Sequence, residues 1–263
     1  MNTATLPPFG VQLREWRQRR RLSQLDLAGD ADVSTRHLSF VETGRAMPSR
    51  EMVLRLADRL DVPLRERNRL LTAAGFAPMF GERPLDDPAL KAAREAIELV
   101  LKGHEPFPAL AVDRHWTLVS YNRAVLPLLT GVAPALVAPP INVLRLSLHP
   151  QGLAPRIANL AQWRAHLLAR LRQQVNVSAD PVLAALADEL RAYPAPADAS
   201  HDAIEAAVVV PLVLRTPAGT LSFISTTTVF GTPVDVTLSE LALETFFPAD
   251  AATAAALRAA LPA

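Results

Sequence analysis

The side chains of this sequence that could carry catalysis or bind a metal are few and scattered. There is no cysteine, which excludes disulfides, thiolate nucleophiles and cysteine-bound metals. The ten glycines form neither a G-x-G-x-x-G nor a G-x-S-x-G motif. Six histidines lack the H-x-H or H-E-x-x-H spacing of metal sites; they are His37, His104, His115, His149, His166 and His201. An enzyme therefore has little support, and we expect no catalytic residue, no metal site and no cofactor.

Arginines, in contrast, are concentrated at one end of the chain. Residues 1–83 carry 14 Arg, no Lys and 10 acidic residues, which gives them a net charge of +4. Residues 84–263 carry 13 basic and 16 acidic residues, a net charge of −3, so the formal net charge of the whole chain is only +1. The basic end predicts contact with a polyanion through a few positioned arginines, with a non-specific affinity that falls steeply with salt.

The basic end has the hydrophobic period and the punctuation of short helices. Phe9, Leu13, Trp16 and Arg20 are spaced four, three and four residues apart, which places them on one helical stripe. Serine hydroxyls can accept hydrogen bonds from the free amides of a first helical turn, and so cap the helix that follows. The pattern predicts five helices: one from Phe9, one over 24–29, one from Ser34 to Glu42, one from Ser49, and one from Pro63 to Gly75.

The turn between the second and third predicted helices carries the most specific pattern in the chain. Its positions are Ser23-Gln24, Leu27-Ala28, Val33-Ser34, Leu38-Ser39, Glu42 and Gly44. They resemble the helix-turn-helix of the XRE family, the phage lambda and Cro repressor-like DNA-binding domains, and the likeness extends from about Phe9 to Gly75. The resemblance implies a third helix that lies in the major groove of a double-stranded DNA operator. It also implies a structural pairing of Arg17 with Glu42.

Carried onto this chain, the resemblance implies which side chains would meet DNA. The outward side of the third helix is expected to carry the base contacts, from Thr35, Arg36, Ser39 and Phe40. Arg36 could donate two hydrogen bonds to O6 and N7 of a guanine. Phosphate contacts are expected at helix N-termini and beyond the third helix, from Gln24, Ser34, Arg45 and Arg50. The structural alternatives are a solvated Arg36 and a Phe40 that packs on Leu64 or its neighbours.

The acidic part of the chain changes from a helical to a mixed pattern. Residues 81–88, GERPLDDP, predict a turn-rich linker. Short β-like runs at 109–113 and 117–121 predict a hairpin, and Asn122 predicts a capped helix through Leu129. Further helices are expected at 89–102, 142–148, 156–174 and 181–193, a surface loop at 194–200, and further strands at 206–215, 221–230 and 238–247. This order predicts one antiparallel sheet of about five strands with helices over one face.

The motifs of this part follow one another in a fixed order. They are Pro108-Ala109-Leu110, Asp113-Arg114-His115-Trp116, Tyr121-Asn122-Arg123-Ala124, Asn142-Val143-Leu144-Arg145, His149-Pro150, Trp163 and Phe246-Phe247-Pro248-Ala249-Asp250. They resemble the ligand-binding domain of MmyB-like transcription regulators, which has a PAS-like fold, over about Asp86 to Leu261. The resemblance implies a domain that holds a small apolar ligand, with a long-chain fatty acid as the class it suggests. Layers of helix and sheet can leave such a cavity between them.

For the ligand site we expect apolar walls from Trp116, Tyr121 and Trp163, and a bidentate grip on a ligand carboxylate from Arg145. Two alternatives stay open at this point. The tryptophans could be ordinary core residues, and Arg145 could pair with a surface acid. The domain itself could serve dimerisation or bind a protein, with no ligand.

Together these patterns predict a multi-domain chain, α followed by α+β. We expect a five-helix lambda-repressor-like domain over 1–80, a linker over 81–88 and a PAS-like ligand-binding domain over 89–263. Helix-turn-helix proteins of this kind bind paired half-sites about 34–36 Å apart, so we expect a homodimer. The sequence has neither the pattern of a signal peptide nor a run that approaches the ~20 apolar residues of a membrane span. We therefore expect a soluble, cytoplasmic protein with no membrane partner.

Overall fold

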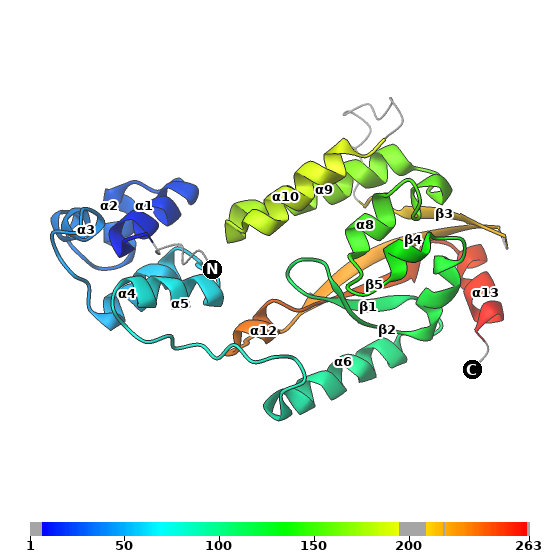
Figure 1. The fold of residues 1–263 in the computed structure, drawn as a ribbon, viewed down its shortest axis with the longest axis horizontal. Coiled ribbons are helices and arrows are strands. Elements are labelled where there is room, and N and C mark those ends of the chain that lie inside the picture. The colour runs from blue at the N-terminus through cyan, green and yellow to red at the C-terminus, as the bar shows by residue number, and fades with distance from the viewer. Residues whose placement is uncertain (1–6, 195–208, 218, 262–263) are drawn as a thin grey trace. The chain divides into compact units, whose positions relative to one another are not determined.

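A computed structural model describes residues 7–194, 209–217 and 219–261. The chain divides into two compact units, with the main boundary between Arg83 and Pro84. We call them the N-terminal unit and the C-terminal unit and describe each by itself. Figure 1 shows the helices and strands of both units.

The N-terminal unit is built from helices. Among its described residues the helices are α1 (Phe9–Arg19), α2 (Gln24–Asp30), α3 (Thr35–Glu42), α4 (Arg50–Arg59) and α5 (Leu64–Ala73). Each contributes at least one leucine that is no more than 1% exposed; these leucines are Leu13, Leu27, Leu38, Leu56, Leu70 and Leu71. The structure confirms the five short helices that the sequence predicts.

Serine caps fix where three of these helices begin. The Ser23 hydroxyl accepts from the backbone N–H of Asp26, and the Asp26 carboxylate accepts from the backbone N–H of Ser23, which completes a capping box. Ser34 and Ser49 accept in the same way from the amide three residues ahead, at 3.1 and 3.2 Å. A cap of this kind contributes about 1 kcal/mol. The starts of α2, α3 and α4 are therefore set by local sequence.

The C-terminal unit is built on an antiparallel sheet that has five strands within the described part of the chain. The strands are β1 (Ala109–Val112), β2 (Leu118–Tyr121), β3 (Leu212–Thr216), β4 (Gly219–Val229) and β5 (Ala242–Pro248), in the order β2-β1-β5-β4-β3. The last strand, β5, thus lies in the middle, between the hairpin of β1 and β2 and the hairpin of β3 and β4. This confirms the predicted α+β class and its antiparallel sheet.

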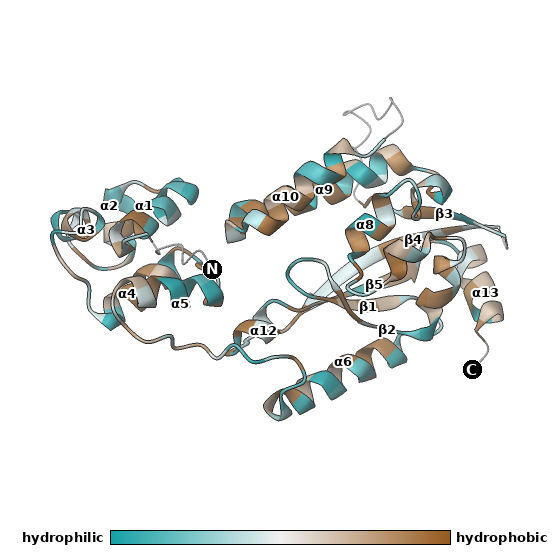
Figure 2. Ribbon diagram, viewed as in Figure 1, coloured by the Kyte–Doolittle hydropathy of each residue, from teal (hydrophilic) through white to brown (hydrophobic). Residues whose placement is uncertain are grey.

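Helices cover both faces of this sheet, which corrects the prediction of helices over one face. On one face, α6 (Lys91–Gly103) packs Ile97 and Leu101 against Ala109 and Ala111 of β1. The opposite face carries Val112 and packs against α8 (Val143–Leu148), α9 (Leu160–Ser178) and α10 (Pro181–Ala192) (Figure 1). Side chains alternate along a strand, and β1 is apolar on both sides, so both of its faces need cover. Figure 2 shows hydrophobic and hydrophilic residues alternating along α6, as expected of a helix with one packed side.

Two predicted boundaries in this unit move for identifiable reasons. The helix predicted at 156–174 is α9, which begins only at Leu160, because residues Ala154–Arg156 form a short 3-10 turn and Ile157 bridges to Leu214 of β3. The strand predicted at 238–247 begins at Ala242, because α12 (Val236–Ser239) takes up its start. The remaining elements are the 3-10 helices η1 (Pro88–Leu90), η2 (Arg123–Leu129) and η3 (Ala154–Arg156), and the α-helices α7 (Pro134–Val137) and α13 (Ala251–Ala260).

Asn122 does not cap the helix that follows it, which corrects a further prediction. Its side-chain amide donates to the carbonyls of Leu101 and Phe107, and its side-chain oxygen accepts from the N–H of Ala109. The amide therefore ties the end of α6 to β1, and the segment after it is the 3-10 helix η2. Residues 195–208, which hold most of the predicted loop at 194–200 and the start of the strand predicted at 206–215, lie outside the described residues.

Candidate functional site

The short helix α3 presents one side to its own core and the other outward. Leu38 and Val41 are each 1% exposed, whereas Arg36, in the first turn of the helix, is exposed. The Arg36 guanidinium lies 5.4 Å from the centre of the Phe40 ring, a cation–π distance that holds both side chains on the outer side. Thr35, Ser39 and Phe40 are half-buried. The four residues predicted to face outward are thus all accessible at the helix surface.

The predicted phosphate contacts are distributed around this helix. Ser34 is exposed and is occupied as the N-cap of α3. Arg45 and Arg50 are exposed, and neither guanidinium forms an ion pair with another described residue. Gln24 is different, because its Nε2 donates to Glu42 Oε2 at 2.8 Å. The structure therefore leaves Arg45 and Arg50 available for an anion and places the Gln24 amide on a buried carboxylate.

That carboxylate belongs to the buried ion pair that orients α3. Arg17 donates from Nε and Nη2 to the two oxygens of Glu42, at 2.6 and 2.9 Å, and the Glu42 side chain is 1% exposed. Burial acts to raise the pKa of Glu42, but the hydrogen bonds from Arg17 and Gln24 outweigh it and hold this pKa below its usual value. The pair ties α1 to the C-terminal end of α3, in agreement with the structural role that the resemblance implies.

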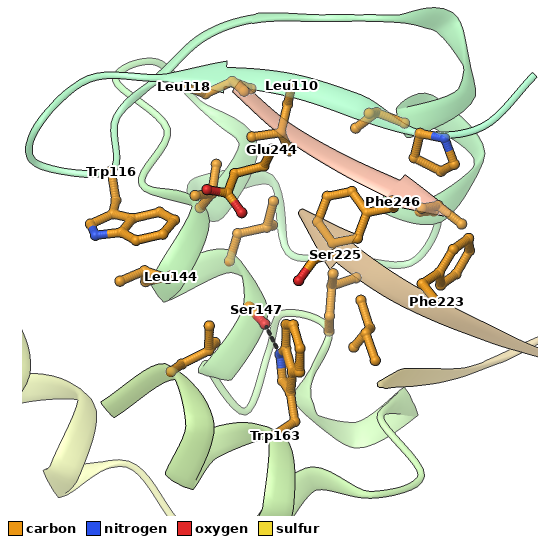
Figure 3. A pocket seen from close by; sticks show the side chains of 18 of the residues that line it. Leu110, Trp116, Leu118, Leu144, Ser147, Trp163, Phe223, Ser225, Glu244 and Phe246 are labelled. Carbon is orange, nitrogen blue, oxygen red and sulfur yellow. Dashed lines mark hydrogen bonds between the residues drawn. The ribbon is translucent and has the colours of Figure 1, made fainter. Parts of the chain in front are cut away.

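The C-terminal unit holds a cavity of about 100 Å³ between the sheet and the helices α8 and α9. Figure 3 shows the side chains that line it. Most are apolar and come from β1, β4, β5, η2, α8 and α9; among them are Leu110, Val125, Leu128, Leu144, Leu146, Leu167, Phe223 and Phe246. The volume is smaller than the ~150 Å³ of an engineered apolar cavity that binds benzene. As it stands, the cavity suits a slender apolar molecule.

Two of the predicted ligand residues, Trp116 and Trp163, lie in its wall. They are 4% and 5% exposed, and the polar N–H of each is hydrogen-bonded: Trp116 Nε1 donates to Gln174 Oε1, outside the lining, at 2.8 Å, and Trp163 Nε1 donates to Oγ of Ser147, which also lines the cavity, at 3.0 Å. Trp116 also has a φ of +65°, a left-handed conformation that costs a bulky residue on the order of 1–3 kcal/mol. Contacts from α9 hold it there.

The other two, Tyr121 and Arg145, do not line this cavity. Tyr121 ends the edge strand β2 and is 43% exposed. Arg145 lies on α8 beside the buried Leu144, so helical geometry turns it toward the solvent side, where it forms a bidentate pair with Glu189 at 2.8 and 2.7 Å. These hydrogen bonds raise the pKa of Arg145 above its usual value. Arg145 therefore makes the surface pairing that the sequence left open as the alternative to a carboxylate anchor.

Sequence reasoning missed the charged residues that do line the cavity, Arg170 and Glu244. Arg170 donates from Nη1 and Nη2 to the two Glu244 oxygens, at 3.0 and 2.5 Å, and from Nη2 to Thr227 Oγ1 at 2.7 Å. Its guanidinium lies 4.5 Å from the centre of the Trp116 ring. One signal was available: Glu244 lies between Ala242 and Phe246 in an alternating strand pattern, which places a carboxylate on an apolar face.

Comparisons with known proteins bear on both units. A family model described as the MmyB-like transcription regulator ligand binding domain matches residues 93–260, more than half of the chain. The chain belongs to the family of MmyB-like transcription regulators. A helix-turn-helix domain model matches residues 8–70, which include α1 to α4 and most of α5. An MmyB-like regulator is a transcription regulator by family, and the family points away from an enzyme.

A curated relative is also described as a transcriptional regulator of the helix-turn-helix type. The chain is 37% identical over 78 residues to the uncharacterized HTH-type transcriptional regulator RghRB of Bacillus subtilis (strain 168), a match that covers 29% of this chain and 54% of the relative. The chain thus spans about half the length of that relative. Within its described residues, this MmyB-like regulator has no helix long and apolar enough to cross a bilayer and no cluster of acidic or histidine side chains that could hold a metal ion.

Proposed function

We propose that this MmyB-like regulator binds a double-stranded DNA operator through the outer side of α3 and that a small apolar ligand in its C-terminal unit controls this binding. The observation that carries the proposal is the apolar cavity, about 100 Å³ in volume, in a chain that also has a helix-turn-helix domain. Arg36 is the base-reading residue in this proposal, with Thr35, Ser39 and Phe40 beside it. Ser34, Arg45 and Arg50 contact phosphates, and Gln24 does so only after it releases Glu42.

Mapping of bound sites across the genome, with and without an extract of cellular lipids, would identify the operator. On that operator, Arg36→Ala is expected to weaken specific binding about 5-fold to 150-fold, because one bidentate base contact discriminates by about 1–3 kcal/mol. Non-specific binding should change little. Arg59→Ala, an exposed arginine of α4 in the same unit, serves as the control for lost charge. A footprint that survives Arg36→Ala would show that α3 reads DNA with other residues.

For the ligand, we propose a molecule with an alkyl chain, the class that includes fatty acids and their neutral derivatives. Leucines, phenylalanines and two tryptophans form the walls, and such walls gain about 25 cal/mol for each Å² of apolar surface removed from water. Mass spectrometry of molecules extracted from the native protein tests this, with Leu144→Trp as a variant that fills the cavity. The wild type should carry an alkyl-chain molecule that the variant lacks. A wild type that is reproducibly empty would count against a ligand.

A homodimer is part of the proposal, and an apolar surface on α6 favours it. Leu99 and Val100 are 72% and 47% exposed, and Val100 borders a shallow apolar hollow that β4 shares through Val229. The same surface supports the second candidate function, a C-terminal unit that serves dimerisation or protein binding without a ligand. Sedimentation of Leu99→Lys tests the dimer. Operator affinity that stays constant across a series of alkyl ligands would favour the second function.

A further inference from the structure

We infer that the cavity is built for an apolar ligand whose polar end is uncharged, such as an alcohol, an ester or an amide, and not for a carboxylate. This inference rests on the proposed function, because it concerns the ligand of the same cavity. It departs from the anchor expected at Arg145, and it depends on two properties of the cavity wall: its charges neutralise one another, and one of its hydroxyl groups is unoccupied.

The charges of the wall are already paired. Among the described residues that line the cavity, Arg170 and Glu244 are the charged ones. Both terminal nitrogens of Arg170 donate to Glu244, whose side chain is 5% exposed, and Thr227 Oγ1 donates a further hydrogen bond to Glu244 Oε1 at 3.0 Å. The face of the guanidinium lies over the Trp116 ring. No net positive charge is left over for an anionic ligand.

The nearby histidine adds no cation. His166 stacks on Trp163, with ring centres 5.5 Å apart. Burial and the neighbouring Arg170 lower the pKa of His166, although Glu244 acts to raise it. At neutral pH the imidazole is therefore uncharged. Among the side chains that line the cavity, a ligand carboxylate would meet the Glu244 carboxylate and no unpaired cation, and burying an unpaired charge is costly.

The hydroxyl of Ser225 offers a binding site for an uncharged polar group. Ser225 lies on β4 and lines the cavity, and Figure 3 shows its hydroxyl directed into the space between Trp163 and Phe246. No side-chain hydrogen bond joins it to another residue in the part of the chain that the structure describes. A hydroxyl can donate or accept, so it suits an alcohol or a carbonyl equally well. A hydroxyl left without a hydrogen bond in an apolar wall costs free energy, so a neutral polar group of a ligand that bonds to it would be stabilised there.

The test compares two probes that differ only at the polar end. 1-Octanol and octanoate are titrated into the full chain at neutral pH by calorimetry, with the four-carbon and six-carbon pairs to allow for the small size of the cavity. We expect the alcohol to bind at least about 10-fold more tightly than the carboxylate, equivalent to about 1.4 kcal/mol. If octanoate binds as tightly as octanol or more tightly, the inference is wrong and the proposed apolar ligand stands. If no probe of either kind binds, both are wrong.

Two variants test whether Glu244 and Ser225 cause the preference for the alcohol over the carboxylate. Glu244→Gln keeps the shape of the side chain and leaves the Arg170 charge unpaired, so octanoate should bind at least about 10-fold more tightly while octanol changes little. Glu189→Gln, which removes the partner of Arg145 outside the cavity, is the matched control and should leave the ratio unchanged. Ser225→Ala should weaken octanol several-fold and octanoate less. Because Ser225→Ala only removes an oxygen, it tests the inference even if Glu244→Gln fails to fold. An unchanged ratio in both variants would overturn it.

Discussion

Each unit of this regulator contains a buried ion pair of the same kind, in different surroundings. Arg17 and Glu42 join α1 to α3, and Arg170 and Glu244 join α9 to β5, in both cases through two hydrogen bonds of 2.5 to 3.0 Å. The glutamate side chains are 1% and 5% exposed. Since the chemistry of the pairs is the same, the difference between them lies in the space around each.

The Arg17–Glu42 pair of the N-terminal unit lies in tightly packed surroundings, whereas the Arg170–Glu244 pair of the C-terminal unit borders the cavity. A Cβ added at Gly10 would lie 2.4 Å from the Glu42 carbonyl oxygen, so α1 and α3 touch backbone to backbone. Arg17 uses its remaining nitrogen on the Leu22 carbonyl, at 2.9 Å. Arg170, in contrast, lines a cavity. A buried ion pair in a filled core fixes a scaffold, whereas a pair beside unfilled space can set the chemistry of a ligand.

The strongest test of this contrast removes one arginine. Arg17→Met should destabilise the N-terminal unit by about 3–5 kcal/mol, because it leaves Glu42 charged, buried and unpaired. Hydrogen exchange of the α1 to α3 amides measures the loss. The double variant Arg17→Met with Glu42→Leu should recover most of it, because no buried charge then remains. A single variant as stable as the wild type would show that the pair does not hold α1 on α3.

Arg170→Met should cost less, about 2–3 kcal/mol. The Arg170 side chain is 23% exposed against 11% for Arg17, and water that enters the cavity can solvate the abandoned Glu244 carboxylate. Hydrogen exchange of the β5 amides measures this loss of stability. A loss as large as that of Arg17→Met would mean that the cavity stays dry and that the two pairs are equivalent.

Gly10→Ala tests the tightness of the N-terminal unit. Alanine normally stabilises a helix by about 0.5–1 kcal/mol relative to glycine. Here the new methyl would meet the carbonyl oxygens of Val41 and Glu42 at 2.5 and 2.4 Å, and backbone cannot yield as a side chain can. We expect overpacking to prevail, with a net loss of about 1–3 kcal/mol in thermal unfolding. Gly29→Ala in α2, where the methyl meets nothing within 4 Å, is the matched control and should be neutral or stabilising.

These contrasts also explain which features the sequence predicts. The helices of the N-terminal unit follow from local signals, such as the caps at Ser23, Ser34 and Ser49, and their positions are confirmed. The antiparallel sheet follows from apolar runs between turn signals. Of the three aromatic residues expected in the cavity wall, Trp116 and Trp163 line it, whereas Tyr121 lies on the edge strand β2 and is 43% exposed.

What could not be predicted depends on contacts between distant parts of the chain. Arg170 and Glu244 are 74 residues apart, and nothing in either segment alone shows that α9 and β5 meet. Arg145 seemed a suitable carboxylate anchor because its partner, Glu189, is 44 residues away in α10. The start of α9 at Leu160 depends in the same way on the bridge from Ile157 to Leu214. Pairing across the fold decides these features, and local pattern does not encode it.

A substitution that fills the cavity should stabilise the C-terminal unit, whereas a substitution that adds atoms to the N-terminal core should destabilise it. Ser225→Val adds apolar atoms where space exists and removes a hydroxyl without a partner, so we expect it to stabilise the ligand-free protein by about 1 kcal/mol. Valine also has a higher strand propensity than serine, and Thr228→Val on the same strand, where residue 228 is exposed, controls for changes of that kind. Thermal unfolding compares the two. A Ser225→Val variant that is destabilised by 1 kcal/mol or so would indicate that the space is already filled.

The smallest expected difference between the units is their response to mild acid. Burial, with Arg170 beside it, lowers the pKa of His166 in the folded state relative to the ordinary value of 6.5. The unfolded chain therefore binds a proton more readily than the folded one, so the contribution of His166 to stability is complete above the unfolded pKa and is lost as pH falls through the folded pKa. The lowered pKa of Glu42 acts in the same direction, but only in the more acidic range where carboxylates titrate.

Between about pH 7.5 and about pH 5.5, then, only the C-terminal unit should lose stability through these two groups. The loss should be small, roughly a few tenths of a kcal/mol, because His166 is only half-buried and solvent screens its charge. Hydrogen exchange of amides in α9 and in α3, compared at the two pH values, separates the units. His166→Gln should abolish the response in α9 and leave α3 unaffected. If α3 responds as strongly as α9, or if α9 still responds in the variant, the acid sensitivity does not originate beside the cavity.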